Sequence, residues 1–134
     1  MREILFRAKR KNGNGEWLYG DLLHDYWVHG DTVMPCAIRY KINSSYSFPI
    51  EVIPETVGQF TGLTDKNGRE IFEGDKFGNE NMPVRHVVFE DGKFCFNRVH
   101  SQGADALSQD RVGRLEIIGN IHDKPELIKQ GGVK

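Results

Sequence analysis

Hydrophobic and polar side chains alternate along two short segments near the N-terminus, residues 4–10 and 16–23. A period of two places neighbouring side chains on opposite faces of a β-strand. The intervening residues 11–15 hold two Asn-Gly pairs, a strong hairpin signal. Residues 1–23 therefore predict an N-terminal β-hairpin. Because an isolated hairpin is marginal in water, we expect its apolar face to pack on the rest of the domain or on another chain.

The same alternation returns in residues 84–90 and 93–99, on either side of the tight turn Asp91-Gly92. It predicts a second hairpin. Residues 78–83 before it predict a loop. The polar residues 100–114 after it predict a loop with one helical turn near residues 105–109. A last strand is expected over residues 115–121, bent at Gly119-Asn120, and a disordered tail over residues 130–134.

Residues 24–56 show a weaker pattern. Apolar triplets flank a short turn expected at residues 29–31, and residues 37–42 are compatible with a strand. The polar residues 43–47 predict a loop. Pro49 and Pro54 bracket residues 50–53, and proline lacks the N–H that a strand ladder needs, so at most a short edge strand is expected there.

The centre of the chain, residues 57–77, is rich in turn-forming residues set between short apolar runs. Asp65-Lys66-Asn67-Gly68 predicts a turn, since Asp and Asn cap local bends and Gly accepts positive φ. Gly74-Asp75 predicts a second turn. Two strands and two bends within about twenty residues are typical of a small all-β fold. The residues expected to build this structural motif are Gly58, Gly62, Asp65, Asn67, Gly68, Gly74 and Asp75.

This central stretch carries a resemblance. Residues 56–63 (Thr-Val-Gly-Gln-Phe-Thr-Gly-Leu), 65–68 (Asp-Lys-Asn-Gly) and 70–75 (Glu-Ile-Phe-Glu-Gly-Asp) resemble the motif of the YopX family, small proteins found mainly in phages and prophages. Residues 1–7, 87–92, 117–122 and 125–127 also resemble that family. Residues 24–50 and 97–112 carry no motif. The resemblance implies a β-rich domain with a small, partly open barrel and a long N-terminal hairpin, and it implies no established activity or catalytic residues.

Length and charge narrow the function class. A chain of 134 residues is expected to form a single domain, with the N-terminal hairpin at residues 1–23 and a barrel-like half at residues 57–128. The net charge of −1 gives no overall field for a phosphate backbone. No apolar run approaches 18 residues, and the N-terminus has no signal-peptide pattern. We therefore expect no membrane association and a cytoplasmic location, and the family resemblance implies that the cytoplasm is that of a bacterial host.

Three carboxylates, Glu70, Glu73 and Asp75, cluster in the central stretch. Paired carboxylates can perform acid–base chemistry when one has a shifted pKa, so a hydrolase is one hypothesis. In the alternative, Asp75 holds a turn and the two glutamates line a solvated strand face. We favour the alternative and expect no catalytic residue.

Metal and cofactor sites are not expected. The five histidines and the two cysteines, Cys36 and Cys95, lack the close pairs of known zinc sites. Cys95 lies between two phenylalanines and is expected to be a semi-buried, inert residue. No phosphate-binding loop, nucleophile elbow or dinucleotide fingerprint is present.

Basic and aromatic residues gather in the N-terminal hairpin and just beyond it. They suggest a stacking surface for single-stranded nucleic acid. In the alternative, the rings cover the core and the basic residues protect an edge strand from aggregation. The residues of this predicted surface are Arg7, Lys9, Trp17, Tyr19 and Trp27.

Taken together, these patterns predict a non-catalytic binding or adaptor module, and the resemblance to the YopX family implies a phage or prophage origin. The partners expected are a second copy of the chain and a host or phage protein. A nucleic-acid-binding small β-barrel and an acid–base hydrolase that uses Glu70, Glu73 and Asp75 are the alternatives.

Overall fold

The computed structural model describes residues 3–28, 30–97 and 105–123. The chain divides into two compact units, Met1–Phe60 (unit 1) and Thr61–Lys134 (unit 2), and each is described by itself. Both are built mainly from β-strands, and their sheets are not closed into a barrel, which confirms the predicted partly open β fold. That residues 1–134 form a single domain stays a prediction. Among the described residues, no helix is long and apolar enough to span a membrane.

The elements of unit 1 are β1 (Phe6–Lys9), β2 (Trp17–Val28), β3 (Thr32–Arg39), β4 (Lys41–Ile42), β5 (Ser45–Tyr46), β6 (Ile50–Glu51), the short helix η1 (Pro54–Thr56) and β7 (Gly58–Thr64), whose last residues belong to unit 2. Those of unit 2 are β8 (Glu70–Phe72), β9 (Asp75–Asn79), β10 (Met82–Glu90), β11 (Lys93–Phe96), β12 (Asp105–Ala106), α1 (Gln109–Val112) and β13 (Ile117–Asn120).

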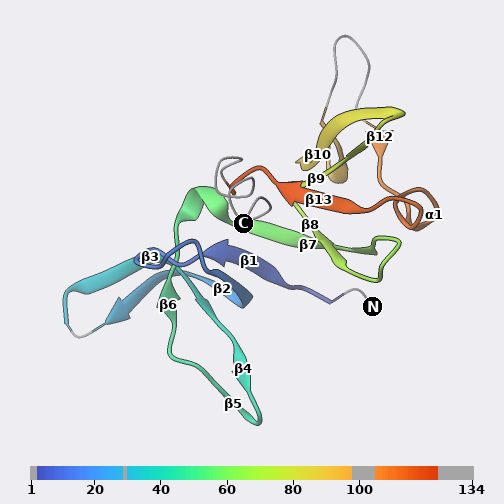
Figure 1. The fold of residues 1–134 in the computed structure, drawn as a ribbon. Coiled ribbons are helices and arrows are strands. Elements are labelled where there is room, and N and C mark those ends of the chain that lie inside the picture. Colours follow the sequence, from blue (N-terminus) through green and yellow to red (C-terminus); the bar gives the residue numbers. More distant parts are fainter. Residues whose placement is uncertain (1–2, 29, 98–104, 124–134) are drawn as a thin grey trace. The chain divides into compact units, whose positions relative to one another are not determined.

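Unit 1 is an antiparallel sheet with the strand order β6-β3-β2-β1-β7. The predicted N-terminal hairpin is confirmed, with Arg7 opposite Tyr19 and Lys9 opposite Trp17, and β2 runs five residues beyond its expected end. The extra length pairs with β3, and β4 with β5 forms a separate hairpin that extends from the end of β3 (Figure 1). The short edge strand expected between the two prolines is β6.

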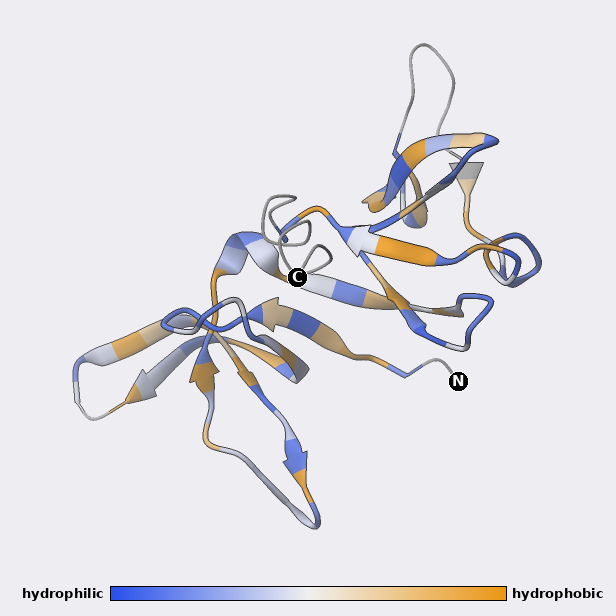
Figure 2. Ribbon diagram, viewed as in Figure 1, coloured by the Kyte–Doolittle hydropathy of each residue, from blue (hydrophilic) through white to orange (hydrophobic). Residues whose placement is uncertain are grey.

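The two faces of this sheet differ in chemistry. Figure 2 shows hydrophobic and hydrophilic bands alternating along β1, as the sequence predicts. One face buries a cluster of small and aliphatic side chains with no aromatic member, Ala8, Leu18, Cys36, Ile38 and Val52. The opposite face carries arginines, aromatic rings and an acid. Because directly opposed residues in an antiparallel pair share a face, Arg7, Tyr19, Asp21 and Arg39 all lie on it.

Unit 2 holds a five-stranded sheet with the order β12-β11-β10-β9-β13. The predicted hairpin at Asp91-Gly92 is confirmed as β10–β11, and both turn residues have positive φ, as a two-residue hairpin of type I′ requires. The core cluster of unit 2 contains two phenylalanines, Phe77 and Phe96, which pack edge to face with ring centroids 5.6 Å apart. Four aliphatic residues complete the buried cluster: Ile71, Val87, Val112 and Ile117.

Two local predictions for unit 2 are wrong. The loop expected over residues 78–83 is instead the end of β9 and the start of β10, joined at Glu80-Asn81. Pro83 is tolerated in β10 because the pairing with β9 is irregular between Met82 and Arg85. The helical turn expected near residues 105–109 begins at Gln109, since the Ser108 hydroxyl accepts a hydrogen bond from Arg111 N–H and caps it. The tail at residues 130–134 lies outside the described residues.

Candidate functional site

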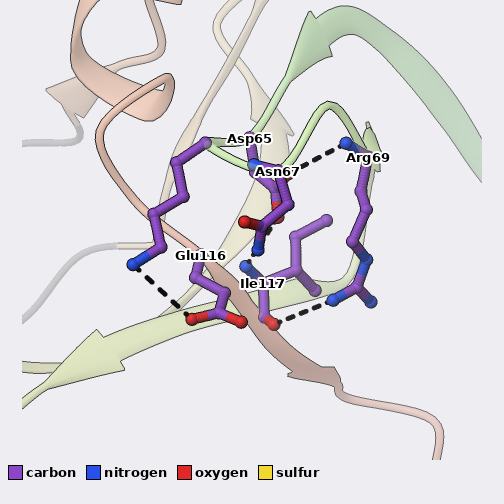
Figure 3. A network of polar contacts seen from close by, with 6 residues as sticks. Asp65, Asn67, Arg69, Glu116 and Ile117 are labelled. Atoms are coloured by element: carbon purple, nitrogen blue, oxygen red, sulfur yellow. Dashed lines mark hydrogen bonds and ion pairs between the residues drawn. The ribbon is translucent and has the colours of Figure 1, made fainter.

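The turn at residues 65–68 is held by one buried carboxylate. Asp65 Oδ1 accepts hydrogen bonds from the backbone N–H groups of Asn67 and Arg69, each at 2.9 Å. Its Oδ2 accepts a third, at 3.1 Å, from the N–H of Ile117 in β13. Figure 3 shows these contacts converging on the turn. The carboxylate therefore both shapes the turn and attaches it to β13.

Two further contacts strengthen this attachment. Lys66 N–H donates to the carbonyl of Leu115, and the Arg69 guanidinium donates to the carbonyl of Ile117. Burial raises the pKa of Asp65, but the three backbone donors and the neighbouring Arg69 charge outweigh it and hold the pKa below its ordinary value. Asp65 is thus a permanently ionised structural group at neutral pH.

The acidic cluster of the central stretch is divided between different environments. Asp75 is buried, and its Oδ2 accepts a 2.8 Å hydrogen bond from Phe72 N–H across the Gly74 turn. Glu70 is exposed at the start of β8, and Glu73 is half-buried in the turn. Asp75 thus has the turn-holding contact expected of a structural carboxylate.

Two of the motif glycines, Gly68 and Gly74, lie in the turns of the central stretch, and Gly58 and Gly62 belong to β7. Gly62, Gly68 and Gly74 all have positive φ, a conformation that other residues rarely adopt. Gly58 is buried at the start of β7, where it pairs with Arg7. With Asp65, Asn67 and Asp75 in the roles described, every member of the predicted motif lies in a turn or a strand pairing.

The predicted basic–aromatic surface is assembled in part. Arg7, Lys9, Trp17 and Tyr19 share one face of the β1–β2 hairpin. The Arg7 guanidinium lies 4.6 Å and the Lys9 ammonium 5.5 Å from the centre of the Trp17 ring. Arg7 is only 6% exposed, so this face is partly covered by its own cation–π contacts.

Trp27, the fifth residue of that predicted surface, lies elsewhere. It is 63% exposed near the far end of β2, where it pairs with Val33. Eight residues of strand separate it from Tyr19, which corresponds to roughly 25 Å at about 3.3 Å per residue. The structure therefore does not unite Trp27 with the other four residues.

A pocket of about 280 Å³ lies in unit 1, in the region that carried no recognisable motif. It lies between the β2–β3 hairpin and the segment that follows β4, and it is called the aromatic pocket below. Its lining residues are Leu23, Tyr26, Arg39, Tyr46, Ser47, Phe48 and Pro49. Phe48 is the most exposed large hydrophobic residue described, at 88%.

Arg39 is the charged residue of the aromatic pocket. Its guanidinium lies 4.2 Å from the centre of the Tyr46 ring, and its Nε lies 3.5 Å from Asp21 Oδ2. In the part of the chain that the structure describes, neither Nη atom has a hydrogen-bond partner. The pocket therefore presents aromatic surface together with the planar donor edge of an arginine.

Sequence reasoning missed this pocket because its residues come from segments that looked like a weak strand and a polar loop. One signal was present in residues 46–49, Tyr-Ser-Phe-Pro, where two aromatic residues interrupt a stretch of Asn and Ser. Large rings in an otherwise polar connection are a useful sign of an exposed contact surface.

The remaining reactive side chains are buried or scattered. Cys36 and Cys95 are both buried, and burial raises the pKa of the Cys36 thiol. Within residues 3–28, 30–97 and 105–123, no group of three or more His, Cys, Asp or Glu side chains is placed to hold a metal ion. His29 and His100 lie outside the described residues.

Comparison with known proteins places the chain in a family. The family model described as YopX protein matches residues 5–129. Among solved structures, the chain is similar to protein EF1440 from Enterococcus faecalis, with a TM-score of 0.54 and 22% identity over 96% of this chain and 99% of that chain. At that identity the likeness shows a shared fold, and no curated protein matches the chain. Because the family model spans nearly the whole sequence, the chain belongs to the YopX family, as its central motif predicted.

Proposed function

We propose that this chain is a non-catalytic binding module and that the aromatic pocket of unit 1 captures a segment of a partner protein. One observation carries the proposal: three exposed aromatic rings, Tyr26, Tyr46 and Phe48, line the pocket, and the segment that supplies them is rich in exposed large hydrophobic side chains. Seven of those described lie between residues 26 and 48, namely Tyr26, Trp27, Val33, Tyr40, Ile42, Tyr46 and Phe48. Exposed apolar patches of this kind are typical of interaction sites.

The size of the pocket supports a protein partner. A pocket of about 280 Å³ is slightly smaller than the roughly 300–1,000 Å³ that encloses a whole small-molecule ligand. It suits an anchoring side chain or two, with the rest of the partner lying on the surrounding exposed rings. Arg, Tyr and Phe, which line the pocket, are residue types enriched in protein interfaces.

A non-catalytic role is supported by the use of the carboxylates. Asp65 and Asp75, the buried acids of the family motif, both accept hydrogen bonds from backbone N–H groups. The donors around Asp65 hold its pKa below the ordinary value, which makes it a weak candidate for proton transfer, and Asp75 Oδ2 is engaged by the N–H of Phe72. The hydrolase alternative therefore depends on Glu70 and Glu73 alone.

Nucleic acid is the second candidate ligand, on the face formed by Arg7, Lys9, Trp17 and Tyr19. Tyr19 is 45% exposed and lies beside two cations, an arrangement that permits base stacking. The Trp17 ring, however, is already in contact with both cations. This candidate requires a binding constant that falls steeply with salt concentration.

A selection of random heptapeptides displayed on phage tests the proposed function. The full chain serves as bait, and peptides that also bind the Phe48→Ser variant are removed at each round. Phe48 is almost fully exposed, so the variant is expected to fold normally. Enriched peptides that bind the unmodified chain at least tenfold more tightly than the variant support the proposal. A selection without enrichment, or peptides that bind both forms equally, would overturn it.

The biological setting is proposed on the family alone. We infer a phage or prophage protein that acts in the bacterial cytoplasm on a host or phage protein. Self-association through unit 1 stays a prediction. The mass of the purified chain in solution tests it, because a monomer at all concentrations would exclude a stable dimer.

A further inference from the structure

We propose that the aromatic pocket recognises an acidic peptide segment, in which a carboxylate side chain follows a proline or aromatic ring. This inference rests on the proposed function, because it assigns a ligand class to the same pocket. It is carried by three properties of the pocket: a guanidinium edge with unused donors, a local excess of positive charge, and uncovered rings.

The guanidinium of Arg39 stacks on the Tyr46 ring, which restrains its plane. Its Nε is buried and lies 3.5 Å from Asp21 Oδ2, without a hydrogen-bond partner among the described residues. Within the described residues, its Nη donors remain without hydrogen-bond partners. A fixed, planar pair of N–H donors matches a carboxylate, which can accept both hydrogen bonds at once.

A second cation lies on the same face. Lys41 in β4 is directly opposite Tyr46 in β5, so the two side chains point to the same side of that hairpin. Lys41 is exposed, and no ion pair of its ammonium group is found among the described residues. Asp21 is the acid that contacts Arg39. The rim of the pocket is therefore complementary to an anionic group.

The rest of the lining offers ring surfaces. Tyr26, Tyr46 and Phe48 are all exposed to solvent, and Leu23 and Pro49 contribute aliphatic surface between them. Grooves lined by aromatic residues are typical binding surfaces for proline-containing segments, whose restricted backbone loses little entropy on binding. Aromatic side chains of a ligand can stack on the same surfaces.

Charge favours a peptide over a nucleic acid as the occupant. Residues 1–60 contain seven basic and seven acidic residues, so unit 1 offers no extended positive field. Nucleic acids bind mainly through the neutralisation of several phosphates, whereas Arg39 and Lys41 can neutralise one or two anionic groups. A short acidic motif within a polypeptide needs no more than that.

Fluorescence anisotropy with defined peptides tests the inference. The first probe is a fluorescein-labelled peptide, Gly-Ser-Pro-Phe-Glu-Asp-Ser-Gly. The second replaces its acids by amides, Gly-Ser-Pro-Phe-Gln-Asn-Ser-Gly. The full chain is expected to bind the acidic peptide about tenfold more tightly, since one charge-assisted hydrogen-bond pair contributes at least that factor.

A matched pair of variants identifies the arginine. Arg39→Gln is expected to weaken binding of the acidic peptide about tenfold and to leave binding of the amide peptide unchanged. Arg10→Gln is the control, because Arg10 is similarly exposed and pairs with Glu16 at the same 3.5 Å separation that joins Arg39 to Asp21. The control is expected to bind both peptides as the unmodified chain does.

The outcomes separate the ligand class from the proposed function. Equal affinity for the two peptides, with binding lost in Phe48→Ser, would overturn the acidic ligand and leave the binding module intact. Equal effects of Arg39→Gln and Arg10→Gln would exclude Arg39 as the recognising group. Binding of a labelled twelve-nucleotide oligothymidylate in place of either peptide would overturn both, in favour of nucleic acid.

Discussion

The two units of this chain contain different kinds of surface and core. Unit 2 buries three phenylalanines, Phe72, Phe77 and Phe96, and carries most of the family motif. It exposes four large hydrophobic residues, Val84, Phe89, Ile118 and Ile121. Unit 1 has a buried cluster without an aromatic residue, and it exposes nine large hydrophobic residues. Five of these nine are aromatic residues between positions 26 and 48: Tyr26, Trp27, Tyr40, Tyr46 and Phe48. The residues of the family motif thus make hydrogen bonds within the fold, whereas the segment without a motif exposes aromatic rings.

This difference separates residues that maintain the fold from residues that we propose as a binding surface. Asp65 and Asp75 are satisfied by the backbone of their own unit, so substitutions there should reduce stability. Tyr26, Arg39 and Phe48 extend into a pocket with few internal partners, so substitutions there should reduce binding and leave stability largely unchanged.

Replacing a core phenylalanine of unit 2 should have the largest effect. Phe77 is fully buried against Phe96, and Phe77→Ala removes both the apolar contact and the edge-to-face ring pair. We expect a loss of about 3–5 kcal/mol in the free energy of unfolding, measured by urea denaturation. The control is Phe89→Ala, whose ring is half-exposed and pairs with Phe94, with an expected loss of about 1 kcal/mol. Equal losses in both variants would contradict the assigned core.

Asp65→Asn should have the next largest effect. The amide keeps one oxygen for the N–H groups of Asn67 and Arg69, but its NH₂ group faces the N–H of Ile117 and leaves that donor unsatisfied. We expect a loss of roughly 1–3 kcal/mol at pH 7. Asn67→Ala is the comparison, since the turn uses only the backbone N–H of Asn67, and it should be less destabilising.

The same carboxylate predicts part of the acid sensitivity of the fold. The pKa of Asp65 is lowered in the folded chain, so its contribution to stability is complete above the unfolded value of about 3.9 and is lost as the pH falls through the lower, folded pKa. Asp65→Asn should therefore flatten the decline in stability below about pH 4. If the stability of Asp65→Asn declines below about pH 4 as steeply as that of the unmodified chain, the Asp65 carboxylate is not a source of the decline.

Gly20→Ala should disturb unit 1 where β2 lies against the backbone of Arg39 in β3. A Cβ at position 20 would overlap the backbone carbonyl of Arg39 and approach the Ile38 side chain. We expect a loss of about 1–3 kcal/mol in the free energy of unfolding from this overpacking. Peptide binding should also weaken, because β3 must shift at Arg39, whose side chain lines the pocket. Gly13→Ala is the comparison, since the nearest atoms to a Cβ at that position belong to the Arg10 side chain, at 3.2 Å and beyond. Intact peptide binding in Gly20→Ala would mean that the position of Arg39 is not critical.

His86 should make a smaller, pH-dependent contribution in unit 2. Burial and the nearby Lys76 charge lower its pKa in the folded chain, so the unfolded chain takes up the proton first. Stability should therefore decrease as the pH falls below about 6.5, the ordinary value for histidine. His86→Gln should remove this slope between about pH 5 and 7, and a persistent slope would assign it to another group.

Phe48→Ser should have the smallest effect on stability and the largest on binding. The ring is 88% exposed, so we expect a change within about 0.5 kcal/mol in the free energy of unfolding. Binding of the acidic peptide should fall at least tenfold. Trp27→Ser is the matched control, because Trp27 is also well exposed but does not line the pocket. If Trp27→Ser weakens binding as much as Phe48→Ser, the contact surface extends along the end of β2.

The sequence alone determined the class of fold, both main hairpins and the central turns. The reason is local: alternating hydrophobicity sets strand faces, and Asn-Gly, Asp-Gly and Asp-Lys-Asn-Gly set turns through the backbone preferences of those residues. Leu18 and Ala8 were assigned to a strand pattern from sequence, and both are buried in the core of unit 1. The family could likewise be read from residues 56–75.

Only the tertiary structure decided which carboxylates are buried, which rings are exposed, and where the pocket lies. Asp65 reaches Ile117 across 52 residues of chain, and Arg39 meets Tyr46 only because β3, β4 and β5 fold back on one another. Trp27 lies far from Trp17 because both belong to one extended strand, which continues beyond residue 23, the end expected from the sequence. Burial and exposure depend on contacts between distant segments, so periodicity within one segment predicts which residues share a face but not which face is covered.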